Sequence, residues 1–136
     1  PLAWGQRARR LSVGIEASFE IEITPADAVL PGTGRFDFTK EWSGAAAGTS
    51  SGVMLSAGDP ASGTAGYVAL ETFDGVLDGR SGTLAFQQFG RMESGAQELR
   101  YEIVPGSGTG ELADVGGTLA LAIDDDGVHH VTFSRR

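Results

Sequence analysis

The sequence has no cysteine among its 136 residues, so neither disulfides nor thiolate metal sites can form. A chain of this kind suits a reducing compartment, and we expect a cytoplasmic protein. At this length a single domain buries a sizeable core without cross-links or metal. No run of about 18 apolar residues occurs, and so no membrane-spanning helix is predicted.

Basic residues are also scarce, at 10 against 18 acidic ones, for a net charge of −8. Half of the basic residues lie near the two ends of the chain, at Arg7, Arg9, Arg10, Arg135 and Arg136. Residues 15–134 hold the other five and all 18 acids, and their net charge is −13. Such an acidic body repels nucleic acid and anionic membranes, and neither is an expected partner.

The first 14 residues are basic and lack the apolar stretch of a signal peptide. We expect residues 1–14 to form a flexible extension and residues 15–136 to form one domain.

Helical periodicity is missing as well. Short alternating runs dominate instead, as is typical of a sandwich or a barrel. They cover residues 18–24, 35–42, 49–57, 64–74, 82–91, 97–104, 116–124 and 127–135. The pair Asp126-Gly127 predicts a hairpin before the last run, and the three acids at 124–126 are interpreted as a solvated turn. We predict an all-β fold, an eight-stranded antiparallel up-and-down barrel, with a two-sheet sandwich as the alternative.

The alternation also predicts which side chains face the barrel interior. Phe36, Phe38 and Trp42 share one face of their run with Lys40, the only lysine of the chain. On the last run, Val131 and Phe133 place His129 inside and His130 outside. The sixth run is expected to bury Leu99, Tyr101 and Ile103.

Two internal repeats support this assignment. With an offset of 35 residues, "GVLDGRSGTLAF" matches "GELADVGGTLAL", and Leu84 matches Leu119. We interpret this repeat as a barrel corner that is used twice, its glycines permitting the bend. With an offset of 31 residues, "KEWSG" matches "ETFDG", which pairs Lys40 with Glu71. If the two copies share their geometry, Glu71 also points into the barrel.

The segments "KEWSG", "YVALETFDGVLDGRSGTLAF" and "YEIVPGSGTGEL" resemble an uncharacterised bacterial family, domain-of-unknown-function family 3224, over residues 17–134. That family resembles the allene oxide cyclase-type barrel, which is lipocalin-like. Proteins of this type include allene oxide cyclase, plant dirigent proteins and bacterial spirocyclases that act on polyketide-derived polyenes. The resemblance implies a small-molecule barrel and points to Lys40 and Glu71. Many members have a histidine where this chain has Gln88.

An inward lysine needs a partner, and the inward Glu71 is the natural one. We predict that Lys40, Glu71 and Tyr67 are catalytic in a cofactor-independent cyclase or isomerase for an apolar, natural-product-type substrate. Lys40 or Tyr67 would polarise a carbonyl, and Glu71 would hold Lys40 or act as an acid/base. The predicted substrate-binding residues are Phe36, Phe38, Trp42, Phe73, Phe86, Gln88, Tyr101, His129 and Phe133. No cofactor is expected. No metal site is expected either, since His129 and His130 alternate across the strand and cannot both bind one metal ion inside the barrel.

Two other interpretations stay open. The barrel could bind a small hydrophobic ligand without converting it, as lipocalins do. It could also be a structural module with a packed interior, in which Lys40 and Glu71 form only a buried ion pair. An open pocket of several hundred Å³ with both residues on its wall would favour the ligand-based functions. The apolar outer face at Val68 and Leu70 indicates a homodimer.

Overall fold

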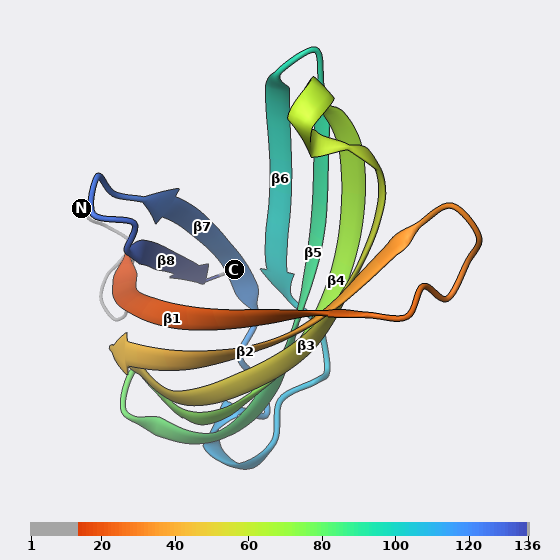
Figure 1. The fold of residues 1–136 in the computed structure, drawn as a ribbon. Coiled ribbons are helices and arrows are strands. Elements are labelled where there is room, and N and C mark those ends of the chain that lie inside the picture. Colours follow the sequence, from red (N-terminus) through yellow and green to blue (C-terminus); the bar gives the residue numbers. More distant parts are fainter. Residues whose placement is uncertain (1–13, 136) are drawn as a thin grey trace.

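The computed structural model describes residues 14–135 of the chain, which form a closed antiparallel barrel of eight strands (Figure 1). Each strand pairs with the next in sequence, and the last pairs with the first, as predicted for an up-and-down barrel. The strands are β1 Ile15–Ala26, β2 Gly34–Gly44, β3 Ala46–Asp59, β4 Thr64–Leu77, β5 Arg80–Glu93, β6 Ala96–Ile103, β7 Gly117–Ile123 and β8 His129–Arg135. Two short 3₁₀ helices, η1 Pro60–Ser62 and η2 Gly110–Leu112, lie in the connections.

The basic extension predicted for residues 1–14 lies outside the described residues, apart from Gly14. Within the part of the chain that is described, no helix is long and apolar enough to cross a membrane.

Tight turns join the long strands. Asp78 and Gly79 between β4 and β5 both have positive φ, at 52° and 80°, and Ser94 and Gly95 repeat this pattern between β5 and β6. Two consecutive residues of this kind suit the right-handed twist of a hairpin. The predicted turn between β7 and β8 is also present, and there the Asp124 carboxylate accepts hydrogen bonds from the backbone N–H groups of residues 126 and 128.

The inward faces predicted from clear alternation are confirmed, with one correction. Tyr101 and Ile103 of β6 are buried as predicted, but Leu99 is 41% exposed, because β6 pairs with β7 at a single position and no strand covers this end of β6. The buried core includes Phe19, Phe38, Trp42, Phe73, Leu84, Phe86, Tyr101, Ile103, Leu119, Val131 and Phe133, and the buried charged residues are Lys40 and Glu71. The outward Val68 and Leu70 are 51% and 57% exposed. The predicted homodimer would cover these two side chains.

The barrel wall is not uniform. β7 and β8 have 7 residues each, whereas β3, β4 and β5 have 14. β6 meets β7 at a single register pair, Glu102 with Thr118, and β8 follows β1 only as far as Phe19. Figure 1 shows β6 standing apart from β7 along most of its length. One end of the barrel is therefore closed. The other end, which we call the mouth, is open between β6 and β7.

The 35-residue repeat correctly predicts which side chains point inward, but its two copies differ in backbone conformation. Gly75–Leu77 continues strand β4, whereas the matching residues Gly110–Leu112 form η2. Both leucines are buried all the same, at 4% and 0% exposure. The second copy is thus not a strand corner, because a 3₁₀ turn can bury the same leucine. The 3₁₀ turn also interrupts the strand alternation between β6 and β7, so the inward face of β6 follows from its own pattern and not from the repeat.

The segment between β6 and β7 replaces a strand along the first half of β5. The backbone N–H groups of Ser81, Thr83 and Ala85 donate to the side-chain oxygens of Glu111, Thr109 and Ser107, respectively. Side chains thus supply the acceptors that a neighbouring strand would supply. Gly82 is required at this contact, because a Cβ there would lie 2.1 Å from the Thr109 carbonyl oxygen.

Two aromatic rings lie over glycines of the neighbouring strand. Phe38 is opposite Gly52, and Tyr67 is opposite Gly90. A Cβ added at Gly52 or Gly90 would lie 2.2 Å from the nearest ring carbon. The missing side chains therefore let both rings lie flat along the wall, and this sets their orientation in the lumen.

We predict that Gly90→Ala destabilises the barrel by about 1–3 kcal/mol, because the new methyl displaces the Tyr67 ring. Gly66→Ala on β4 is the matched control, since its Cβ would meet nothing closer than 3.5 Å. Urea unfolding of the two variants measures the difference. Equal stability of both variants would show that the ring does not depend on the glycine.

Candidate functional site

Three strands bring Lys40, Glu71 and Tyr101 together inside the barrel. The Lys40 Nζ donates to Glu71 Oε1 and to the Tyr101 hydroxyl, both at 3.0 Å. The Tyr101 hydroxyl donates to the same Oε1, also at 3.0 Å. The three residues are 4%, 2% and 3% exposed. The 31-residue repeat thus correctly predicted that Glu71 points inward beside Lys40.

The other carboxylate oxygen of Glu71 is also occupied. Ser50 Oγ donates to Oε2, and the Trp42 indole N–H donates to Ser50 Oγ at 3.0 Å. The ammonium lies 4.2 Å from the ring centroid of Phe19, close enough for a cation–π contact. Burial of this ion pair is therefore accompanied by hydrogen bonds to both carboxylate oxygens, as a buried charge requires.

Burial shifts the titration of two members of this cluster. It lowers the pKa of Lys40, whereas the neighbouring Glu71 opposes that shift. Burial also raises the pKa of Tyr101, and the negative charge of Glu71 adds to this effect. Tyr101 therefore stays a neutral donor at physiological pH.

Four predicted substrate-binding residues, Trp42, Phe73, Phe86 and Phe133, pack against one another in the closed half of the barrel. The ring centroids of Trp42 and Phe73 are 6.0 Å apart, and those of Phe73 and Phe86 are 5.8 Å apart. All four side chains are at most 4% exposed. They form a dense aromatic floor, on which the charged cluster rests.

A pocket of about 470 Å³ opens at the mouth, and six strands contribute to its wall. Of the predicted site residues, Phe36 and Tyr67 line it, but Lys40 and Glu71 do not. The larger apolar side chains that also line it are Met54, Met92, Leu99 and Leu121. Alternation along each strand predicts that these side chains point inward. Which of them remain exposed to the pocket depends on the short lengths of β7 and β8, which alternation does not predict.

Two further predicted residues face the lumen and remain half-buried. Gln88 on β5 lies between Ala69 of β4 and Tyr101 of β6 in the register. His129 stacks on Phe19 with ring centroids 4.9 Å apart. Burial and the charge of Lys40 lower its pKa, so that the imidazole is neutral at physiological pH. His130 lies outside, as predicted, and bonds to Asp124.

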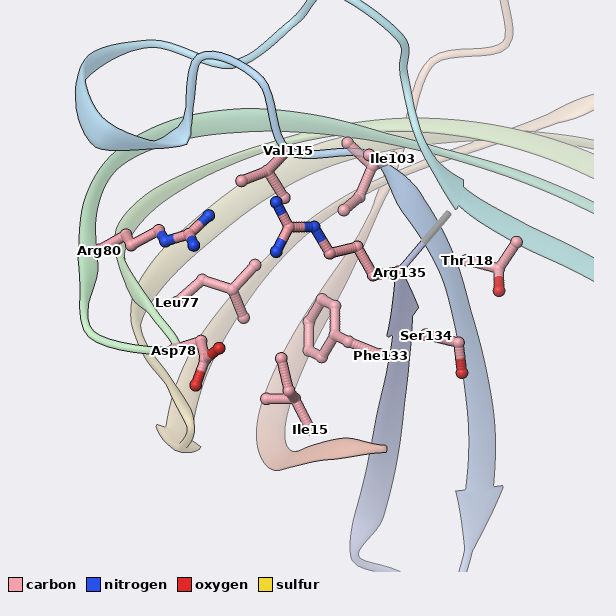
Figure 2. Close-up of a pocket in the computed structure, with 11 residues that line it drawn as sticks. Ile15, Leu77, Asp78, Arg80, Ile103, Val115, Thr118, Phe133, Ser134 and Arg135 are labelled. Carbon is pink, nitrogen blue, oxygen red and sulfur yellow. The ribbon is translucent and has the colours of Figure 1, made fainter. Parts of the chain in front are cut away.

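A second cavity, at the closed end, has a volume of only about 30 Å³. Figure 2 shows that Leu77, Ile103 and Phe133 line it, with Arg80 and Arg135 beside them. This space suits one or two water molecules and is far below the size of a ligand pocket. Among residues 14–135, no group of three or more His, Asp or Glu side chains could hold a metal ion.

Fold and site together define a class of protein: a closed eight-stranded β-barrel with a buried lysine–glutamate–tyrosine cluster beneath an apolar mouth pocket. The chain belongs to the DUF3224 family, described as a protein of unknown function, whose model matches residues 15–134. The likeness of this barrel to allene oxide cyclase stays a prediction.

A crystal structure of a DUF3224 protein of unknown function from Shewanella oneidensis MR-1 is similar to this chain, with 38% sequence identity and a TM-score of 0.83. The match covers 90% of this chain and 95% of that one. No curated protein matches the chain.

We predict that removing either charge of the cluster destabilises the fold far more than removing both. Lys40→Met or Glu71→Gln alone leaves an unpaired buried charge, which costs about 3–5 kcal/mol, whereas the double variant loses much less than the sum. Urea unfolding of the four proteins gives the coupling energy. The exposed pair Arg35–Asp37 is the control, and its coupling should stay below about 1 kcal/mol. Similar coupling in the two pairs would contradict the structure.

We predict that neither of the two tyrosines of the chain ionises near pH 10 while the protein is folded. Burial raises the pKa of both Tyr67 and Tyr101 above the ordinary value of 10.0. The unfolded chain releases these protons from about pH 10, so the tyrosines make stability fall as the pH rises through that value. Lys40, with its lowered pKa, acts in the opposite direction. Ultraviolet absorbance of tyrosinate checks this against urea-unfolded protein, and a tyrosine that titrates at 10.0 in the native state would refute it.

Proposed function

We propose that this protein binds a small apolar molecule in the mouth pocket. The observation that carries the proposal is the open volume of about 470 Å³ with an apolar wall. Small-molecule pockets typically have volumes of about 300–1,000 Å³ and combine an apolar wall with a few polar groups. The polar side chains on this wall are Ser56, Tyr67, Arg91, Gln97 and Glu98.

Exposed apolar side chains inside the barrel support the proposal. Ile23, Leu99 and Ile123 face the lumen side of their strands, yet they are 53%, 41% and 60% exposed. Apolar side chains in the closed half are buried almost completely. The exposure of the three residues above is therefore specific to the open end and is not a general lack of core packing. An apolar ligand would cover the remaining surface and gain about 25 cal/mol for each Å² removed from water.

Both methionines of the chain, Met54 and Met92, line this pocket. Methionine side chains are flexible and polarisable, and they adapt to ligands of different shape. The wall is therefore better suited to a range of apolar molecules than to one rigid shape.

The geometry favours binding over the cyclase or isomerase activity predicted from the sequence. Catalytic groups must reach the reacting atoms. Lys40 and Glu71 bond to each other below the pocket, and of the three predicted catalytic residues only Tyr67 lies on the wall. The position of Tyr67 on the pocket wall is the observation that supports the enzymatic alternative. A change in the mass or chromatographic retention of a bound ligand after incubation would favour that alternative.

The purely structural alternative fits only half of the barrel. The closed half is packed with aromatic rings, as a structural module requires, but the mouth half is not. We therefore assign stability to the closed half and binding to the mouth.

We predict that Nile red, an uncharged dye whose fluorescence rises in apolar surroundings, binds the barrel in a saturable way. Leu99→Gln with Leu121→Gln should weaken binding by about tenfold, since both side chains line the pocket. The dye titration is read against urea unfolding, so that loss of fold is not taken for loss of binding.

The matched control carries Val68→Gln and Leu70→Gln, which remove two exposed apolar side chains from the outer face of β4. Its affinity for the dye should equal that of the unmodified protein. A dye that binds none of the three proteins, or that responds only to the outer-face variant, would overturn the proposal.

A further inference from the structure

Two polar side chains near the pocket have no hydrogen-bond partner in the described chain. The Tyr67 hydroxyl on β4 lies on the pocket wall, and its side chain is half-buried. Gln88 on β5 is not itself on the pocket wall, but it faces the lumen beside Tyr67 and is also half-buried. Polar groups at this depth ordinarily find a partner in protein or water. Both are thus available to a ligand.

The two groups are close enough to bind one polar group together. Tyr67 lies opposite Gly90, and Gln88 is the next inward residue along β5. The two residues are therefore diagonal neighbours on one face of the sheet, about 7–8 Å apart at their backbones and within reach of long side chains. The absence of a side chain at Gly90 holds the Tyr67 ring flat beside this position.

Neither of the two cations near the mouth pocket, Lys40 and Arg91, is free to receive an anionic ligand. The charge of Lys40 is balanced by Glu71 at 3.0 Å. At the rim, Arg91 bonds to Glu93 and lies 3.9 Å from Glu98. Residues 15–134 carry a net charge of −13, which adds a repulsive field. A carboxylate or phosphate would lose its hydration here without gaining a counter-ion.

The apolar surface also extends beyond the pocket. Leu99 on β6 and Leu121 on β7 line it from opposite sides of the opening, and Ile123 continues the apolar surface further along β7. Because β6 and β7 share one register pair, the wall between them does not close over this surface. A long chain could lie along it and leave its polar end inside.

We propose, building on the binding function above, that the ligand is an elongated, uncharged apolar molecule whose one polar group is a hydroxyl or a carboxamide. The Tyr67 hydroxyl donates to the oxygen of that group. The Gln88 amide accepts from its O–H or N–H, because the glutamine carbonyl oxygen is an acceptor. Gln88 is thereby a specificity-determining residue.

A set of probes with one chain and different ends tests this class: decanol, decanamide, decanoate and decylammonium. Competition with Nile red should give about tenfold tighter binding of decanol and decanamide than of decanoate. Carbon-13 labelling of the methionine methyl groups adds a site-specific readout, since the only two methionines both line the pocket. Both methyl signals should shift with the uncharged probes.

Variants then separate the polar contact from general apolar binding. Tyr67→Phe and Gln88→Leu should each weaken decanamide binding by about three- to tenfold, a larger loss than either variant causes for Nile red. Gln87→Leu is the matched control, because this neighbouring side chain is exposed and bonds to Glu102 on the outer face. It should leave the affinity for every probe unchanged.

The outcomes distinguish the two proposals. If Nile red binds as predicted but decanoate competes as well as decanamide, or Gln88→Leu behaves like Gln87→Leu, the inference about the polar group is wrong and the binding function stands. If decylammonium binds most tightly, the ligand class is cationic and the inference is likewise overturned. If no probe shifts the methionine signals and Nile red does not bind, the binding function itself fails.

Discussion

The ion pair between Lys40 and Glu71 is the interaction on which the rest of this structure depends. It joins β2 to β4 over the intervening strand β3, and Tyr101 extends the connection to β6. Removing one charge of such a pair leaves the other unpaired in an interior of low dielectric constant. Neighbours of the pair are therefore constrained: Ser50 must satisfy the second carboxylate oxygen, and Trp42 must hold Ser50. The packed aromatic floor follows, because only closely fitted apolar side chains keep water from this cluster.

The same pair divides the barrel into two halves with different properties. Below it, rings fill the interior, and above it the lumen widens into a pocket of about 470 Å³. Strand length explains the difference. β7 and β8 have half the length of β3, β4 and β5, so they cover the cluster and its floor but not the mouth. The segment after β6 supplies side-chain acceptors to β5 where no strand runs beside it, and so the closed end stays sealed.

Alternation and internal repeats were sufficient to predict the strands, the barrel and the inward direction of Glu71. These are local properties, since each follows from a period of two along one strand. The partners Tyr101 and Ser50, by contrast, depend on how far each strand is shifted against the next around a closed sheet. No single strand carries that information. The repeat misled at Gly110–Leu112, because two segments can bury the same leucine with different backbones. The open mouth could not be predicted from the sequence either, since it depends on where β7 and β8 end.

A cluster whose charges already bond to each other is a poor catalyst but a good boundary for a pocket. Chemistry gains from groups that interact more strongly with the transition state than with the ground state. To contact a substrate, Lys40 and Glu71 would first have to break the bonds between them. The free-energy cost is similar to that of leaving a buried charge without a partner. Left intact, the pair presents no net charge to the lumen, and two of the three ammonium N–H donors of Lys40 are already bonded, to Glu71 and to Tyr101. The polar contacts of a ligand then fall to Tyr67 and Gln88, which are uncharged, and an uncharged ligand is the complement of such a site.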